Sequence, residues 1–340
     1  MQRLILLITT LALAACSDPR QEVTAQLADQ VLLPAHQQWL RSNEALLETT
    51  RAGCAGELAL AEIEQAFHQT QSAWSRLQPL MVGPLSEGNR SWQVQFWPDK
   101  RNMVARQTES LLDEAPELDQ QQLDDASVVV QGLTAFEYVL FDEQVAIRES
   151  RDRYCPLLVG IARHQQALSA EVVTLWQQPE GMLEQLTTFP NGRYANADEA
   201  LGGILRVQIT AVDTLKKKLG TPMGRLNRGV PQPYQAEAWR SRRSTENLIA
   251  SLQGAQAVWE RVRSLVGDAQ LVADIDEAYQ RVHDQLDALP APLMEIVQDP
   301  DSQAQLQSLY QDLDTLETLQ QSDLARDLGI QLGFNANDGD

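Results

Sequence analysis

The sequence predicts an all-α protein, and two observations support this fold class. First, leucines recur three or four residues apart near the carboxyl end, which places them on one helix face: Leu306, Leu309, Leu313, Leu316 and Leu319. Second, alternating β-branched runs are rare, and the short stretch "SVVVQG" is the one strand candidate. Hydrophobic residues make up 43% of the chain, enough to bury substantial helix faces.

The amino-terminal stretch reads as an export signal over residues 1–15. A basic residue is followed by an apolar run that is too short to span a membrane. The run ends in "LAAC", which resembles a bacterial lipobox, so we expect Cys16 to be lipidated and to become the first mature residue. Residues 16–22 would then be a tether. Ser17 follows the cysteine, and sorting rules that this position resembles place such lipoproteins in the periplasm on the outer membrane of a Gram-negative bacterium.

Two helical domains are expected downstream, over residues 23–190 and 196–340. The Pro-, Gly- and Asn-rich stretch "FPNGRYANAD" separates them, and Asn196 or Asp198 can cap the next helix. The segments "QSAWSRLQPLMVG" and "QAVWERVRSLVG" align with one gap, placing Trp74 on Trp259. This echo predicts an internal duplication, with chance similarity between amphipathic helices as the alternative.

Three cysteines are present, and Cys54 and Cys155 remain once Cys16 carries lipid. In an oxidising compartment an even pair predicts a disulfide. Two separate buried thiols or a metal site are the alternatives, although a pair of cysteines without a neighbouring histidine makes a poor zinc site.

The charge balance excludes one class of partner. The formal net charge is −20, from 47 acidic and 27 basic residues. Phosphate binding needs a basic face, so nucleic acid is not an expected partner. An acidic surface keeps a protein soluble and can attract cations.

The stretch "QGLTAFEYVLFD" contains a lone carboxylate, Glu137, within an apolar run. Thr134 lies three residues earlier and would share its helix face. A His-x-x-Glu pair at this spacing aims two ligands at a metal, whereas a threonine hydroxyl is a weak metal ligand and a good hydrogen-bond partner. Glu137 is therefore a candidate metal ligand, or else it pairs with an arginine or tyrosine from another helix and fixes the packing.

A second candidate is the stretch "EAWRSRRSTENL". If it is helical, Arg240, Arg243 and Asn247 form one stripe with Ser244 close by. Such a stripe could bind an anion or the Glu137 carboxylate, and a solvated basic face is the alternative.

Two further stretches supply candidate residues. In "FWPDKRN", Trp97 begins a rigid turn and Asp99 can cap the helix that follows, with a cap and turn as the plain alternative to a site. The final "GFNANDGD" places Asp338 in a calcium-loop composition, but the chain ends before an EF-hand could form. The four histidines are scattered, and the phosphate-loop and Gly-x-Ser-x-Gly signatures are missing.

Together these stretches, with "RDRYCPLL" and "KKLGTPMG", resemble the imelysin family over roughly residues 25–340. The resemblance implies two helical bundles related by duplication, with a cleft between them that holds the candidate residues. Family members are secreted or lipid-anchored, several are linked to iron regulation, and the first were described as metallopeptidases. The family motif is Gly-x-His-x-x-Glu, which Gly132 and Glu137 match, whereas Thr134 replaces the histidine.

This departure orders the functional hypotheses. The first is a non-catalytic binding protein in iron acquisition, with envelope iron-uptake proteins as partners. In this hypothesis Glu137 forms a hydrogen bond with Thr134 and an ion pair with Arg240 or Arg243. The second is direct binding of iron or another divalent cation through Glu137 and carboxylates from other helices. The third is a metallopeptidase, which needs about three protein ligands and a general base, and the missing histidine argues against it.

Overall fold

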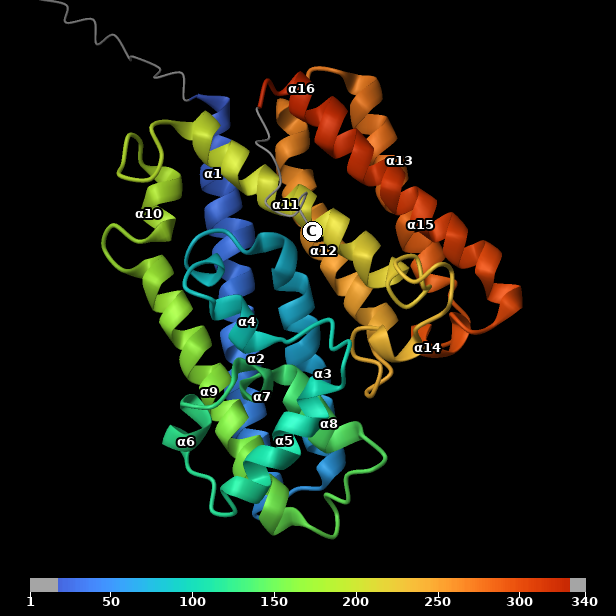
Figure 1. Ribbon diagram of the computed structural model, residues 1–340. Helices are drawn as coiled ribbons and strands as arrows, with labels where there is room; N and C mark the ends of the chain where they lie inside the picture. The colour runs from blue at the N-terminus through green and yellow to red at the C-terminus, as the bar shows by residue number, and fades with distance from the viewer. Residues whose placement is uncertain (1–17, 331–340) are drawn as a thin grey trace, which may run out of the picture.

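The computed structural model describes residues 18–330 and confirms the all-α fold class, with no strand in that range. Figure 1 shows the helices of the first half as a long bundle, with α11–α16 packed against its upper part. The expected signal segment, the lipidation site at Cys16 and the candidate Asp338 lie outside the described residues.

Long helices build the frame of the molecule. They are α1 (Pro19–Leu27), α2 (Leu33–Cys54), α3 (Leu60–Leu77), α5 (Met103–Glu114), α8 (Leu133–Phe141), α9 (Arg151–Gln177), α11 (Ala197–Gly220), α12 (Ser244–Val262), α13 (Ala269–Asp287) and α15 (Gln303–Thr318). Short helices fill the spaces between them: α4 (Arg90–Val94), α6 (Gln120–Asp124), α7 (Val128–Gln131), α10 (Met182–Thr187), α14 (Leu293–Ile296) and α16 (Ala325–Asp327).

Single turns of tighter or wider helix extend or connect these elements. They are η1 (Ala28–Leu32), η2 (Gln78–Leu80), η3 (Pro84–Ser86), η4 (Pro233–Gln235), η5 (Arg263–Leu265), η6 (Pro300–Ser302) and η7 (Leu319–Leu324). Because η1 joins α1 to α2 without a break, the chain from Pro19 to Cys54 is one long helical rod.

Capping residues start the helices where the sequence places them. The Asn196 side chain accepts a hydrogen bond from the Glu199 amide at 3.0 Å, so it caps α11 as expected. Asp268 accepts from the Gln270 amide at 2.8 Å and caps α13 in the same way.

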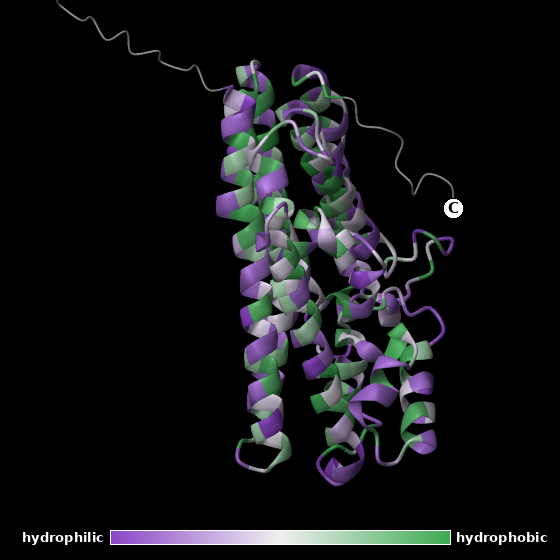
Figure 2. Cartoon of the chain, turned by 90° about the vertical axis from the view of Figure 1, so that its left-hand side faces the viewer, coloured by the Kyte–Doolittle hydropathy of each residue, from purple (hydrophilic) through white to green (hydrophobic). Residues whose placement is uncertain are grey.

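Burial follows the apolar spacing. The leucine stripe of α15 faces inward, with Leu306, Leu309, Leu313 and Leu316 buried and Leu319 partly buried against the same core. Figure 2 shows hydrophobic and hydrophilic residues alternating around the long helices, as expected when each helix has one apolar and one polar face.

The two halves of the chain share one hydrophobic core. Helix α12 packs along α3, and α11 packs against α1 and η2. At Gly254 on α12, an added Cβ would come within 2.1 Å of the Arg76 carbonyl oxygen, so only glycine permits this close helix approach. The proposed domain boundary therefore falls between helical groups that bury apolar surface against each other.

The tryptophans of the internal echo lie on the two helices that make this contact. Trp74 of α3 and Trp259 of α12 are both buried. The Trp74 indole donates to Gln95 at 2.8 Å and the Trp259 indole donates to Asp276 at 2.7 Å. Equivalent burial fits the aligned positions, and the duplication itself stays a prediction.

The predicted disulfide is present. Cys54, at the end of α2, is bonded to Cys155, near the start of α9, across a sequence separation of 101 residues. Within the described part of the chain, no helix has both the length and the apolar character that crossing a membrane would require.

Candidate functional site

Helix α8 carries the Gly-x-x-x-x-Glu element, and its position is fixed at Gly132. A Cβ at this residue would come within 2.6 Å of the Val94 carbonyl oxygen and 2.9 Å of the Gln93 carbonyl oxygen. The segment that ends α4 therefore crosses the start of α8 in direct backbone contact, which a larger residue would prevent.

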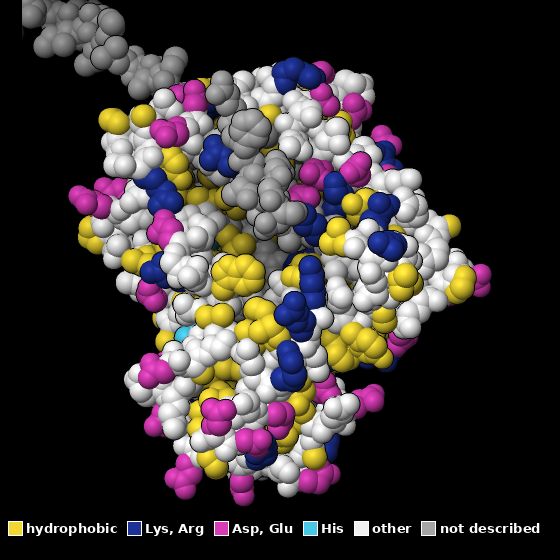
Figure 3. Space-filling model, in the orientation of Figure 1, with side chains coloured by type: hydrophobic (Ala, Val, Ile, Leu, Met, Phe, Trp, Pro, Cys, Tyr) yellow, Lys and Arg dark blue, Asp and Glu magenta, His cyan; other side chains and the backbone are white. Residues whose placement is uncertain are grey.

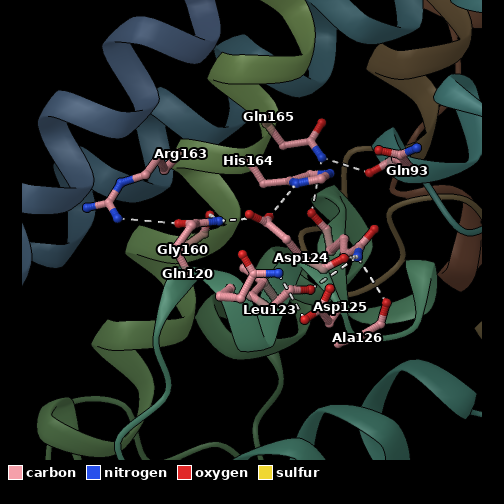
Figure 4. Close-up of polar contacts among 12 residues, drawn as sticks. Gln93, Gln120, Leu123, Asp124, Asp125, Ala126, Gly160, Arg163, His164 and Gln165 are labelled. Atoms are coloured by element: carbon pink, nitrogen blue, oxygen red, sulfur yellow. Dashed lines mark hydrogen bonds and ion pairs between the residues drawn. The ribbon is translucent and has the colours of Figure 1, made fainter.

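Side-chain amides behind α8 hold the same crossing. Figure 4 shows Gln165 of α9 reaching the α4 end, and its Nε2 donates to the carbonyl oxygens of Gln93 at 2.7 Å and Gln131 at 3.1 Å. The side-chain amide of Gln131 in turn donates to three carbonyl oxygens at the end of α6 and just after it, those of Leu123, Asp124 and Ala126. These buried amides secure the backbone on both sides of Gly132.

Thr134 takes part in this crossing and does not bond to Glu137. Its hydroxyl accepts from the Phe96 amide at 3.2 Å and donates to the Phe96 carbonyl at 3.3 Å. The prediction of a Thr134–Glu137 hydrogen bond is thus wrong, because the backbone of Phe96 offers the Thr134 hydroxyl both a donor and an acceptor. Through these two hydrogen bonds, Thr134 holds the segment that leads to Trp97.

Glu137 joins the two halves of the molecule. It is only 2% exposed, and its Oε1 accepts from the backbone amide and the hydroxyl of Ser241, both at 2.8 Å. Burial raises the pKa of this carboxyl, while the two Ser241 donors and the nearby Arg240 charge oppose the rise. Glu137 therefore packs between helical groups and is not among the residues that line the cavities described below.

The expected basic stripe does not form, because residues 237–243 are not helical. Helix α12 begins at Ser244, and Ala238 and Arg242 have positive φ angles of 54° and 61°, which interrupt regular helix. Arg240 and Arg243 thus leave the loop in different environments. Ser244 donates its hydroxyl to the Glu237 carbonyl, which ties the loop to the start of α12.

Arg240 is paired, but not with Glu137. Its guanidinium donates to Asp142 at 2.7 Å and to Asn102 at 2.9 Å, and it stacks 4.3 Å from the Trp239 ring centroid. The expected direct pairing with Glu137 is therefore wrong, and Arg240 acts on that carboxyl only through its charge.

Arg243 and Asn247 are also apart from Glu137. Arg243 pairs at the surface with Glu246 at 2.8 Å, which matches the solvated alternative for this residue. Asn247 is buried on α12, and its Nδ2 has no hydrogen-bond partner among the described residues.

Asp99 is a helix cap, as expected. Its two carboxylate oxygens accept from the Met103 amide at 2.6 Å and the Val104 amide at 3.1 Å, at the start of α5. Two residues earlier, the Trp97 indole donates to the Gln235 carbonyl oxygen at 3.1 Å, which fastens the turn to the second half.

A buried ion pair that the sequence analysis missed lies beside Trp97. Lys218, near the end of α11, donates from Nζ to Glu237 and to Gln78, both at 2.5 Å, and lies 5.9 Å from the Trp97 ring centroid. Both charged side chains are almost fully buried. A signal existed, since Lys218 lies three residues after the core residue Leu215 and so falls on the buried face of its helix.

A cavity of about 540 Å³ lies between the two halves. The first half contributes Trp74, Gln78, Met81, Ser86, Ser91, Trp92, Gln95 and Trp97, and the second contributes Arg206, Val207, Thr210, Ala211, Thr214, Lys218 and Ser251. We call this space the inter-half cavity. In Figure 3, hydrophobic side chains gather in the middle of the face, beside a column of Lys and Arg side chains.

A second cavity of about 630 Å³ opens on the other side of the Trp97–Asp99 turn. Its lining is rich in charge and includes Asp99, Lys100, Arg101, Asp142, Arg240 and Arg242. The candidate residues are therefore divided, with Trp97 in the inter-half cavity and both Asp99 and Arg240 in the second.

A metal site does not assemble from these residues. Within residues 18–330, no group of three or more His, Cys, Asp or Glu side chains is placed to hold a metal ion. Glu137 is bonded to Ser241, and Thr134 is bonded to the backbone of Phe96. These groups are hydrogen-bond partners and do not form a transition-metal ligand set.

One family model and two solved structures are similar to this chain. The family model for imelysin, also designated peptidase M75, matches residues 32–320. An imelysin-like protein from Psychrobacter arcticum superposes with a TM-score of 0.80 at 19% identity, covering 93% of this chain and 97% of that one. A protein described as an iron-regulated protein A precursor from Parabacteroides distasonis gives 0.73 at 14% identity, covering 89% and 94%. No curated protein matches the sequence.

Proposed function

The chain belongs to the imelysin family, and from this premise we propose that it is a non-catalytic binding protein of the cell envelope that serves iron acquisition or regulation. The observation that carries the proposal is the inter-half cavity, which both halves line. A ligand in this cavity would contact helices from both halves, so binding would be linked to how the halves are held together.

The surroundings of Glu137 favour binding over peptidase chemistry. A metallopeptidase needs about three protein ligands, an open metal position and a base that reaches water. Here the Glu137 carboxylate is buried and accepts two hydrogen bonds from Ser241, and Thr134 holds backbone. The motif residues thus support the cavity wall, with Thr134 fixing the segment that presents Trp97.

Two independent features support the iron and envelope context. One of the similar structures belongs to a protein described as iron-regulated. The "LAAC" sequence at residues 13–16 fits a lipobox, so we propose that Cys16 anchors the protein in the outer membrane facing the periplasm. Partners would then be iron-uptake proteins of the same envelope.

The cavity is tested by filling it. Val207→Trp on α11 adds a large side chain to the cavity wall, whereas Arg148→Gln changes a surface residue that lines neither cavity. In cells deleted for the gene and grown under iron limitation, we expect Arg148→Gln and wild type to restore growth and Val207→Trp to fail. Full rescue by a folded, membrane-localised Val207→Trp protein would sink the cavity as the functional site.

Direct metal binding is tested separately. The mature protein is titrated with Fe²⁺, Fe³⁺, Zn²⁺ and Ca²⁺ in a calorimeter, and the Glu137→Gln variant is titrated in the same way. We expect the variant to give the same heats as wild type, with no saturable heat that depends on Glu137. A stoichiometric heat that depends on Glu137 would replace the proposal with metal binding.

A further inference from the structure

The wall of the inter-half cavity carries aromatic side chains that suit a flat apolar group. Three indoles, Trp74, Trp92 and Trp97, line it from the first half, opposite Val207 and Ala211 of α11. Trp92 is 51% exposed, although it is among the largest apolar side chains in the protein. An exposed indole at a cavity marks a surface that gains from being covered by another ring.

The charge in this cavity is not balanced. Lys218 is neutralised by its buried pair with Glu237. Arg206 is exposed, and within residues 18–330 it makes no ion pair or side-chain hydrogen bond. Among the described residues, this leaves one positive charge at the cavity without a countercharge and no carboxylate in the lining, although the net charge of the chain is −20.

The distribution of these groups along α11 gives the ligand a direction. Arg206 and Lys218 are 218 − 206 = 12 residues apart in one helix, which is roughly 18 Å at the helical rise per residue. Val207, Ala211 and Thr214 lie between them on the same lining. A ligand that enters with its apolar end first would meet the indoles and leave a polar end beside Arg206.

We propose that the inter-half cavity binds an aromatic anion, with its ring system stacked among the tryptophans and its anionic group beside Arg206. This assignment rests on the proposed function, because it names the ligand class of the same cavity. A guanidinium that has no side-chain partner among residues 18–330 can take a carboxylate or sulfonate in paired geometry.

The test uses two fluorescent probes that differ in charge. Anilinonaphthalene sulfonate has an aromatic body and one negative charge, and N-phenylnaphthylamine is its uncharged relative. We expect both to bind the mature protein and to accept energy from tryptophan, with the anion binding more tightly. Raising the salt concentration should weaken only the anion, because an exposed cation is screened.

Matched arginine variants separate the charge from the cavity. Arg206→Gln should weaken the anionic probe about three- to fivefold, the size of an exposed ion pair, and leave the neutral probe unchanged. Arg148→Gln removes the same charge from a surface residue outside the cavity and should change neither. Equal weakening by the two variants would overturn the assignment of Arg206.

Aromatic variants test the cavity itself. Trp92→Ala removes a half-exposed side chain, so the fold should survive, and both probes should lose about tenfold in affinity. Val207→Trp should reduce both further, with circular dichroism confirming the helices. Suppose that Trp92→Ala and Val207→Trp weaken binding of the neutral probe, but Arg206→Gln leaves the affinity for the anionic probe unchanged. The cavity would then still be a binding site, and the inference that it prefers an anion would be wrong. If neither aromatic variant affects either probe, the proposed function fails as well.

Discussion

Two buried glutamates lie near each other and are stabilised in opposite ways. Glu137 accepts hydrogen bonds from the neutral amide and hydroxyl of Ser241, whereas Glu237 faces the Lys218 ammonium at 2.5 Å. Glu137 and Ser241 are 104 residues apart in the sequence, whereas Glu237 and Lys218 are 19 residues apart. One contact depends on dipoles and the other on a full opposite charge.

The difference shows which contact tolerates change. A carboxylate held by neutral donors can become an amide of the same shape and keep its hydrogen bonds. A buried ion pair cannot lose one member without leaving the other charge unpaired in a low-dielectric interior. Glu137 should therefore behave as a replaceable connector and Lys218–Glu237 as an interdependent pair.

The largest expected effect comes from breaking the ion pair. Lys218→Met leaves the Glu237 carboxylate buried without its cation, and we expect a loss of about 3–5 kcal/mol in the free energy of unfolding. Urea denaturation followed by circular dichroism measures it. The double variant Lys218→Met with Glu237→Gln should regain most of that loss, and purely additive effects would contradict the pairing.

Removing the Glu137 side chain should cost less. Glu137→Ala leaves the Ser241 amide and hydroxyl without an acceptor, so we expect a loss of about 1–3 kcal/mol. Glu137→Gln keeps an oxygen for Ser241 and serves as the control, with a change below about 1 kcal/mol. If both variants melt like wild type, Glu137 does not hold the halves together.

The pH dependence sharpens the comparison further. The pKa of Glu137 is raised above its usual 4.5 in the folded state, so the folded protein binds this proton more tightly than the unfolded chain does. The resulting stabilisation is complete below that value and is lost as pH rises through the folded pKa. Wild type should therefore lose this increment on going from acid to neutral pH, whereas Glu137→Gln should lack it. Identical pH profiles of stability would disprove the raised pKa.

The smallest effect is expected at the surface. Arg243 and Glu246 form an exposed pair three residues apart, so Arg243→Gln should change stability by less than about 0.5 kcal/mol. Thermal denaturation at low and high salt is the measurement. A loss comparable to that of Lys218→Met would mean that Arg243 has a buried role that the structure does not give it.

Local sequence patterns predicted the fold well because they depend on short-range physics. The α15 leucines, the caps at Asn196 and Asp99, and the Cys54–Cys155 pair each follow from spacing or residue chemistry. The prediction of a helical stripe after Glu237 was wrong for a reason that residue spacing does not reveal. Positive φ angles at Ala238 and Arg242 interrupt a stretch whose composition is compatible with helix.

Long-range partners were the part that sequence could not supply. Glu137 and Thr134 share a helix, yet each turns to a different segment, Ser241 in one case and Phe96 in the other. Both partners offer backbone groups, and any residue type carries those. Lys218 alone left a readable sign, because a lysine on the buried face of a helix requires a partner.

The backbone contact at Gly132 places a mutational constraint on the protein at a distance from any ligand. A side chain there would displace the segment that ends α4, which continues through Gln95 to Trp97 in the cavity wall. A larger residue at position 132 would therefore act on the cavity wall through this segment, even though Gly132 does not line the cavity itself. We therefore expect position 132 to require glycine whatever residue stands at position 134.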